Sequence, residues 1–199
     1  FERHALAYER RGFVNFQLRN YKDALYDYTK SIDINPRNAE PYLGRAFVYL
    51  QQEEWEKAIT DLEFAIKQSI PLQPMYWKSR RLKGECHLQL EQYKKAAFEY
   101  KLVARRTFEA EDPNFKWRKQ AWYNYGVALL KMEEYAEALK AFDAATAIPE
   151  GRTTFTEAEL LLHHGLALQK SGKSGFEKDW KAAAKMGSTR AAELLEEMA

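Results

Sequence analysis

The feature that most constrains the fold is a pair of amphipathic segments within residues 121–145, joined by a short polar turn. On one face of each segment, large and small side chains recur at helical spacing, as in Trp122/Gly126/Leu129 and Tyr135/Ala138/Phe142. Helix axes approach closely only where small side chains lie between them, so the pattern predicts a packed helical hairpin. One hairpin cannot bury its own apolar stripe, and the pattern therefore also predicts similar neighbours.

The rest of the chain supplies these neighbours. The start of each second helix is marked by an aromatic residue followed three positions later by Ala, at Tyr21/Ala24, Trp55/Ala58, Tyr93/Ala96 and Tyr135/Ala138. A small residue of the first helix recurs in step, at Gly12, Ala46, Gly84, Gly126 and Gly165. Prolines follow the second helices, where they cannot continue a helix, at Pro36, Pro71 and Pro149. Self-similarity of this kind predicts an all-α stack of repeats.

The pattern resembles the tetratricopeptide repeat family, whose period is 34 residues, over nearly the whole chain. The resemblance implies an all-α fold, an α-α superhelix or solenoid of about five stacked hairpins with a C-terminal capping helix. We expect a single domain, 1–199, with repeats at approximately 3–36, 39–70, 74–108, 113–148 and 155–187, and a cap helix at 188–198. The end of the fifth repeat, Trp180–Gly187, is similar to a Sel1-type repeat.

The spacing between repeats lengthens along the chain, and we expect longer helices to absorb the added residues. Asp112-Pro113 reads as an N-cap followed by proline at the first helical position, so the first helix of repeat four should start near Pro113. The second helix of repeat three should extend into residues 105–110. Pro74 should start repeat three, and Ser188 should cap the last helix.

Composition excludes several classes of protein. The chain has 31 basic and 29 acidic residues, a formal net charge of +2, which argues against a dedicated nucleic-acid binder. Its one cysteine excludes an internal disulfide framework and leaves the cytoplasm and the periplasm both open as compartments. No apolar run approaches the roughly 20 residues of a membrane span. The chain begins at Phe1 inside an apparent helix without a cap, which predicts a missing upstream segment or a self-association surface.

No catalytic or metal-binding constellation is recognisable. Adjacent helix positions point about 100° apart, so neither His163/His164 nor Cys86/His87 is placed to hold one metal ion. The chain has no His-Glu-x-x-His motif, no phosphate-binding Gly-rich loop and no Gly-x-Ser-x-Gly motif. We therefore expect no catalytic residues, no metal, no cofactor and no small-molecule substrate.

The family resemblance places a partner-binding groove on the first helices of the repeats. The residues it assigns to that groove, and on which a bound partner should depend, are Glu9, Phe13, Phe16, Leu43, Phe47, Leu50, Lys78, Arg81, Tyr123 and Val127. Phe16 and Leu50 could equally belong to the core. Lys78 and Arg81 fit either an anionic anchor beside an apolar floor or an ordinary solvated helix face.

One subgroup of the family grips the C-terminal carboxylate of chaperone tails with Lys and Asn in the first repeat, Asn in the second, and Lys and Arg in the third. The corresponding positions here are Glu9, Phe13, Gly44, Lys78 and Leu82. Only Lys78 matches this pattern. The sequence therefore predicts that the chain does not form this carboxylate clamp.

Three functions compete. The first is a non-catalytic protein-interaction module that holds a peptide or helix of another protein in the groove. The second is a structural segment of a larger scaffold or of a self-associating assembly, joined through the end at Phe1. The third, least favoured, is weak binding of nucleic acid through the basic residues 77–119, which carry a net charge of +6 and include Lys94, Lys95, Arg105 and Arg106.

Overall fold

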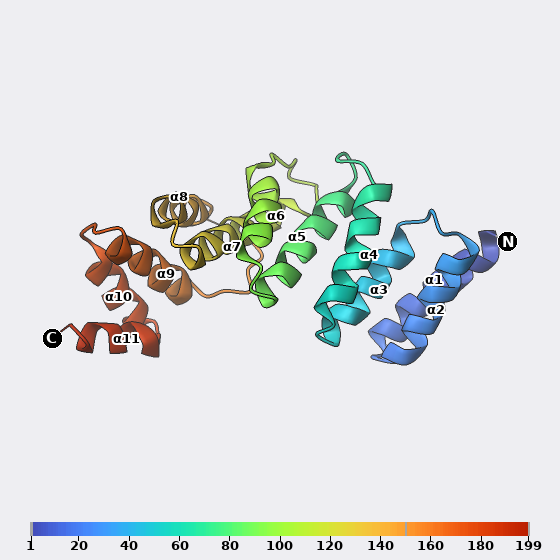
Figure 1. Ribbon diagram of the computed structural model, residues 1–199, viewed down its shortest axis with the longest axis horizontal. Coiled ribbons are helices and arrows are strands. Elements are labelled where there is room, and N and C mark those ends of the chain that lie inside the picture. Colours follow the sequence, from blue (N-terminus) through green and yellow to red (C-terminus); the bar gives the residue numbers. More distant parts are fainter. Residues whose placement is uncertain (1, 150, 199) are drawn as a thin grey trace. The chain divides into compact units, whose positions relative to one another are not determined.

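The computed structural model describes residues 2–149 and 151–198, and in these residues it contains eleven α-helices, one short 3-10 helix and no strand (Figure 1). The predicted all-α repeat fold is thereby confirmed. The helices form two compact units, Phe1–Gln92 and Tyr93–Ala199. We describe each unit by itself, and the single-domain organisation stays a prediction.

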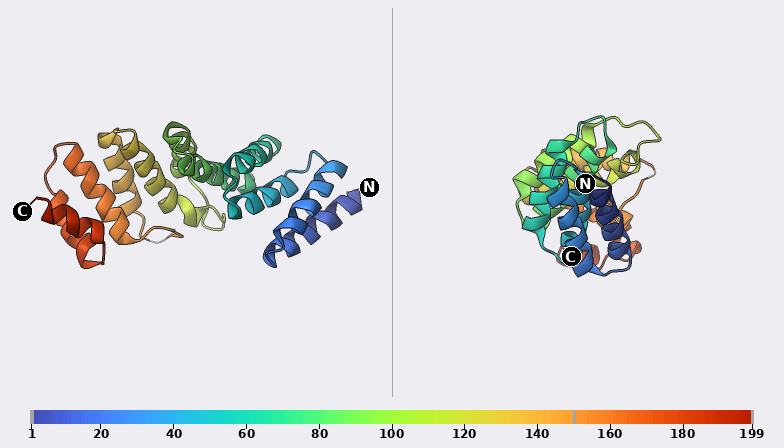
Figure 2. Two further views of the ribbon diagram at one scale, coloured as in Figure 1. Left: turned by 60° about the horizontal axis from the view of Figure 1, so that its bottom comes forward. Right: turned by 90° about the vertical axis from the view of Figure 1, so that its right-hand side faces the viewer.

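Unit 1 contains five helices, each packed on the next along the chain. The pairs α1/α2 and α3/α4 are helical hairpins in both views (Figures 1 and 2). Pro74 occupies the first turn of α5, as predicted. The bounds are α1 Glu2–Gln17, α2 Tyr21–Ile34, α3 Glu40–Gln51, α4 Trp55–Gln68 and α5 Pro74–Gln89.

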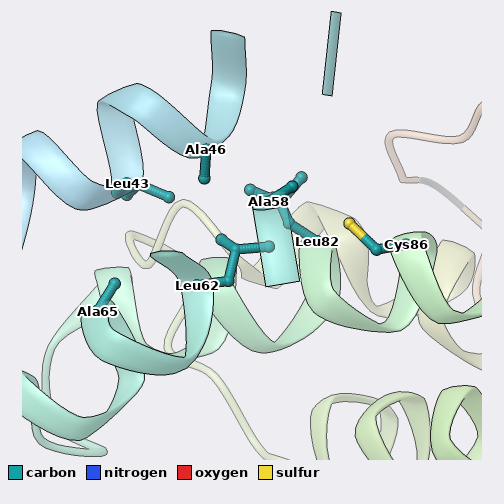
Figure 3. Packing of buried hydrophobic residues seen from close by; sticks show 7 residues of the cluster. All are labelled: Leu43, Ala46, Ala58, Leu62, Ala65, Leu82 and Cys86. Carbon is teal, nitrogen blue, oxygen red and sulfur yellow. The ribbon is translucent and has the colours of Figure 1, made fainter. Parts of the chain in front are cut away.

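The core of unit 1 is built where three helices meet. Seven buried residues from α3, α4 and α5 cluster there, and the small ones let the helices approach closely (Figure 3). The members of this core cluster are Leu43, Ala46, Ala58, Leu62, Ala65, Leu82 and Cys86. Burial raises the pKa of the Cys86 thiol to about 12, so it behaves as a small apolar residue.

Unit 2 contains six α-helices and the 3-10 helix. Helices α6 and α7, α7 and α8, and α9 and α10 pack as neighbours, and α11 packs on α10. The bounds are α6 Tyr93–Arg105, η1 Phe115–Trp117, α7 Arg118–Lys131, α8 Tyr135–Thr146, α9 Glu157–Lys170, α10 Phe176–Lys185 and α11 Thr189–Glu196.

The prediction that longer helices fill the wider spacing holds for the first helix of repeat three, where α5 has 16 residues against 12 in α3, but it was wrong between repeats three and four. Helix α6 ends at Arg105, and α7 begins at Arg118 rather than near Pro113. Asp112 does act as a cap, but of a tight turn: its Oδ1 accepts a hydrogen bond from the Asn114 backbone N–H at 2.7 Å, and a 3-10 turn follows. The additional residues therefore form an irregular connection.

The alternation of large and small residues works as predicted. A Cβ added at Gly126 would lie 2.6 Å from Cε1 of Phe142, so the ring fills the space that glycine leaves. The same relation holds in the fifth repeat, where a Cβ at Gly165 would lie 2.5 Å from Nε1 of Trp180. Phe142 and Trp180 are both fully buried. In these two repeats, the first helix thus accepts a bulky side chain from its second helix.

The turn inside each hairpin repeats one backbone conformation. A non-glycine residue at the helix end takes a left-handed φ of 55–62° in four repeats, at Arg19, Glu53, Glu91 and Glu133. The amide of the next residue donates to the carbonyl five positions earlier, as in Asn20 N–H to Asn15 O at 2.8 Å. The fifth repeat has Gly172 at this position with φ 70°. The hairpin geometry is thus specified locally in each repeat.

In repeats one and two, an ion pair with a buried aspartate joins the two helices of the hairpin at a spacing of 16 residues. Arg11 holds Asp27 with two hydrogen bonds of 2.9 and 2.6 Å, and Arg45 holds Asp61 with two of 2.8 Å. Sequence reasoning overlooked these pairs, although the spacing recurs between repeats one and two. In the fifth repeat, His164 takes the place of the arginine, and its Nδ1 lies 2.6 Å from Oδ2 of Asp179.

The start of the last helix was predicted correctly. The side-chain oxygen of Ser188 accepts from the Ala191 backbone N–H, which starts α11, and Gly187 ends α10 with φ 95°. Across the described residues, every helix is too short or too polar to traverse a lipid bilayer.

Candidate partner-binding groove

Unit 1 carries an open hollow with a volume of about 570 Å³ on the side formed by its first helices. Residues of α1 and α3 supply most of the lining, and α2 and α5 contribute one each. The lining comprises Glu9, Arg10, Phe13, Val14, Phe16, Gln17, Tyr28, Glu40, Leu43, Gly44, Phe47 and Lys78. Six of the ten residues predicted for the groove therefore lie around one hollow.

The floor of the hollow is apolar and partly exposed. Phe13 is 57% exposed although it is a large hydrophobic side chain. Phe16 packs against Phe47 with 6.1 Å between ring centroids. It also packs against a small buried cluster formed by Ala24, Tyr28 and Val48. Phe16 thus belongs to both the floor and the core. Leu43 is buried and supports the floor from below. A hollow with an apolar, aromatic floor and a few charged groups around it is typical of a binding site.

Tyr28 closes the bottom of the hollow. Its ring lies between two helices, because a Cβ at Gly44 of α3 would come within 2.4 Å of it and one at Gly12 of α1 within 3.1 Å. Burial raises the pKa of the hydroxyl to about 12, and the charges of Glu9 and Glu40 act in the same direction. The phenol is therefore neutral at physiological pH.

The carboxylates of Glu9 and Glu40 line the hollow. Glu9 accepts a hydrogen bond from Nδ2 of Asn38 at 2.7 Å. Burial raises the pKa of Glu40, the neighbouring Glu9 charge raises it further, and Lys78 lowers it. Glu9 and Phe13 are four residues apart, and so are Glu40 and Gly44, so each carboxylate shares a helix face with residues of the hollow.

Lys78 lines the hollow from α5. Its Nζ is 4.6 Å from the centroid of the Phe47 ring, a cation–π contact. Burial lowers the pKa of this ammonium, the charge of Arg81 lowers it further, and Glu40 opposes both. In the described part of the chain, Lys78 forms no ion pair with Glu9 or Glu40. Its charge is held against the aromatic floor.

The remaining predicted residues of unit 1 lie outside the hollow. Leu50 is partly buried and packs on the core cluster. Arg81 is 9% exposed, so it acts on the hollow only through its charge. Leu82, which occupies a position of the carboxylate clamp, is buried in the core cluster. Sequence position alone could not separate these residues from their exposed neighbours.

In unit 2, the predicted groove face of α7 is covered by the chain itself. The aromatic ring of Phe155 stacks on Tyr123 with 3.9 Å between centroids and 20° between planes. Two hydrogen bonds of 2.6 Å hold the same segment: Arg152 N–H donates to Lys116 O, and Thr154 N–H donates to Oε1 of Gln120. Tyr123 is consequently only 7% exposed, while Val127 is partly buried. Residues 151–155 therefore leave almost no surface of Tyr123 for a partner to contact.

Six lining residues were not among the predicted groove residues: Arg10, Val14, Gln17, Tyr28, Glu40 and Gly44. Arg10 and Val14 neighbour predicted groove positions on α1, and their exposure places them on its rim. Tyr28 belongs to α2, the second helix of its repeat, whereas the prediction placed the groove on the first helices. The presence of Gly44 opposite it, where the tetratricopeptide pattern does not require glycine, was the available signal.

The histidines of unit 2 are engaged in packing. His163 contacts the Tyr123 hydroxyl and the Glu159 carbonyl through Nδ1, at 3.0 and 2.8 Å, and its ring stacks beside Phe142. His164 lies between Asp179 and Asp143. Within residues 2–149 and 151–198, there is no cluster of three or more His, Cys, Asp or Glu side chains arranged to hold a metal ion.

Curated relatives share only part of this chain. The human DnaJ homolog subfamily C member 7 is 29% identical over 89 residues, which are 45% of this chain and 17% of that protein. The human serine/threonine-protein phosphatase 5 is 26% identical over 104 residues, 52% of this chain and 20% of that protein. The chain thus spans about a fifth of these relatives.

Solved structures match over nearly the whole chain. The crystal structure of YrrB, described as a TPR protein with an unusual peptide-binding site, has a TM-score of 0.79 at 18% identity and covers 97% of this chain and 92% of its own. That of MamA has a TM-score of 0.73 at 17% identity, with 96% of both chains covered. At these identities, the likeness shows the fold alone.

Two family models, both described as tetratricopeptide repeat, match the sequence. One matches residues 43–113 and the other residues 5–38 and 119–148. Together they span more than half of the chain, in step with the hairpins of both units. The chain belongs to the tetratricopeptide repeat family.

Proposed function

We propose that this chain is a non-catalytic interaction module that binds an extended peptide or a helix of another protein in the hollow of unit 1. The observation that carries the proposal is the partly exposed apolar floor, which includes Phe13, Phe16 and Phe47. Tetratricopeptide repeat proteins are interaction scaffolds, and the structural relative YrrB is described as having a peptide-binding site. A partner that covers this floor would remove apolar surface from water.

The chain's own residues 151–155 support this mode of binding. They lie on the first helix of repeat four, with an aromatic ring, Phe155, stacked on Tyr123 and a backbone amide bonded to Gln120. In the repeat register, Gln120 corresponds to Glu40 and Tyr123 to Leu43. A partner segment in the hollow of unit 1 would use the corresponding positions, with an apolar side chain on the floor and its backbone against the wall.

The proposal excludes a carboxylate clamp. Three of the five clamp positions are filled here by an exposed phenylalanine, by a glycine packed on Tyr28, and by Leu82 in the core cluster. None of these can donate a hydrogen bond from its side chain to a terminal carboxylate. Calorimetry with an acidic chaperone-tail peptide should show no binding, and micromolar affinity would contradict this part of the proposal.

Two alternatives remain as proposals of lower rank. Self-assembly through the N-terminal end rests on Phe1, which lies outside the described residues, and a strict monomer at high concentration in sedimentation would count against it. Nucleic-acid binding rests on the basic residues 77–119, and it requires an affinity that falls steeply with salt. For the fifth repeat, we retain the Sel1-like assignment of Trp180–Gly187 as a proposal.

The proposed function is tested by affinity capture from the native cell followed by mass spectrometry. Three baits are compared: the unchanged chain, Phe13→Ala and Tyr26→Ala. Tyr26 is a matched control because it is also an exposed aromatic residue of unit 1, 54% against 57%, and it does not line the hollow. Phe13→Ala should lose the proteins that Tyr26→Ala retains. If both variants retain every partner while their circular dichroism is unchanged, the hollow is not the binding site.

A further inference from the structure

The hollow of unit 1 has an uneven charge distribution, which restricts the partner it can accept. The carboxylates of Glu9 and Glu40 face it from α1 and α3, and Lys78 faces it from α5. Arg10 lies at the exposed rim. These four side chains are the charged groups of the lining, and their individual contacts decide which charges remain available to a partner.

The carboxylates are available. Glu40 makes no side-chain hydrogen bond and no ion pair within the described residues, although it is partly removed from water. Glu9 has one of its two oxygens engaged, by Asn38. The raised pKa of Glu40 reflects burial and repulsion by Glu9 that the nearby lysine does not cancel. A positive charge placed between the two carboxylates would relieve this repulsion.

The lysine is less available. Its ammonium already lies on the Phe47 ring at 4.6 Å, and burial and Arg81 both disfavour its charged form. An anionic side chain approaching Lys78 would also approach Glu40, whose charge acts on the same ammonium. An acidic segment would therefore meet repulsion from the wall of the hollow.

Repeat four provides a comparison at the same register. There Gln120 accepts the backbone N–H of Thr154 through its amide oxygen. Repeat two has Glu40 at this position, an acceptor that carries a full negative charge when ionised. Hydrogen bonds from a cationic donor to a carboxylate are shorter and stronger than neutral ones. The exposed ring of Phe13 adds a surface on which a guanidinium can stack.

We propose that the hollow is selective for a protein segment in which a basic side chain, Arg or Lys, lies next to a large apolar residue. The apolar residue covers the floor at Phe13 and Phe47, and the basic side chain lies between Glu9 and Glu40. This inference rests on the proposed function of the hollow and specifies the chemistry of its partner.

A phage-displayed library of random dodecapeptides tests the proposal. The library is selected on the unchanged chain, and each selected peptide is tested again on Phe13→Ala, so that only peptides bound at the floor are counted. We expect these peptides to be enriched in Arg or Lys within a few residues of a large apolar side chain. Enrichment in Asp or Glu, or no preference for charge, would overturn the inference and leave the proposed function standing. A selection without any Phe13-dependent peptide would overturn both.

Charge-removing variants then locate the effect. For a selected basic peptide, Glu40→Gln and Glu9→Gln should each weaken binding about tenfold, because each removes one of two charges facing the cation. Glu56→Gln is the matched control, since Glu56 is an exposed carboxylate of unit 1 that does not line the hollow. Replacing the peptide's arginine by neutral citrulline should produce a similar loss on the unchanged chain and little further loss on Glu40→Gln. Equal losses on all three variants would contradict a local role of the two carboxylates.

Discussion

Replacing Gly44 by alanine should disturb the fold and the hollow together. The added Cβ would lie 2.4 Å from both Cε1 and Cζ of Tyr28 and 2.8 Å from its hydroxyl oxygen. The ring cannot move away freely, because its other side packs on α1, where a Cβ at Gly12 would lie only 3.1 Å from Cδ1. Either the ring or helix α3 must shift, and both line the bottom of the hollow.

The size of the effect follows from two opposing contributions. Overpacking a filled core costs about 1–3 kcal/mol, and replacing glycine by alanine inside a helix gains about 1 kcal/mol. Since two ring atoms are overlapped and the ring is held from both sides, the upper end of the cost applies. We expect Gly44→Ala to lower the free energy of opening of α1–α3 by about 2 kcal/mol. Gly12→Ala requires the Tyr28 ring to shift by only tenths of an ångström. It should leave the free energy of opening nearly unchanged, because the gain from alanine in a helix offsets this smaller packing cost.

Hydrogen exchange of the amides in α1–α3 is the suitable assay, because local opening energies can be read without assuming that both units unfold together. Tyr28→Leu in both backgrounds completes a double-mutant cycle. A coupling of at least about 1 kcal/mol between positions 44 and 28 is expected, with the smaller side chain relieving the alanine. If Gly44→Ala were as stable as the unchanged chain and uncoupled from Tyr28, the proposed packing between the two helices would be refuted.

Three further predictions concern buried groups. Arg45→Met should lower the free energy of unfolding, measured in urea, by about 3–5 kcal/mol, because it leaves the buried Asp61 carboxylate without its partner. A loss below about 1 kcal/mol would contradict the role of this ion pair. The Cys86 thiol, whose pKa burial raises to about 12, should react with Ellman's reagent at pH 8 only on unfolding; immediate reaction in native buffer would refute its burial. Burial lowers the pKa of His163, so the unfolded chain binds the proton more readily and stability should fall as pH decreases through about 6.5. In His163→Gln, the urea midpoint should fall less steeply with decreasing pH. If the pH dependence of the midpoint were unchanged, His163 would not be its cause.

The repeat register was predictable from the sequence because it depends on local size alternation. The pairing of Gly126 with Phe142 follows from helical spacing within one hairpin, and the pairs Gly12/Tyr28 and Gly165/Trp180 repeat it. The register then placed Phe13, Phe47 and Lys78 on the first helices, and these residues do line one hollow. What the periodicity specifies is therefore the position of a side chain on its helix.

Exposure of a given groove position depends on distant segments, which periodicity does not describe. Tyr123 and Phe13 were both assigned to the groove face of a first helix, but Phe155 covers Tyr123 while Phe13 stays exposed. The irregular connection between α6 and α7 was missed for a related reason. Asp112 and Pro113 carry the composition of a helix start, and the same cap can equally form an isolated turn.

The central claim is that a partner protein contacts the floor of the hollow, and photo-crosslinking in the native cell tests it most directly. A benzophenone amino acid is placed at position 13 in one variant and at position 26 in another, where Tyr26 is equally exposed. We predict that position 13 crosslinks to a specific protein, within a segment that contains a large apolar residue beside Arg or Lys, and that position 26 does not. The account would be contradicted if position 13 gave no specific crosslink, or if a partner protein crosslinked from position 26 and not from position 13.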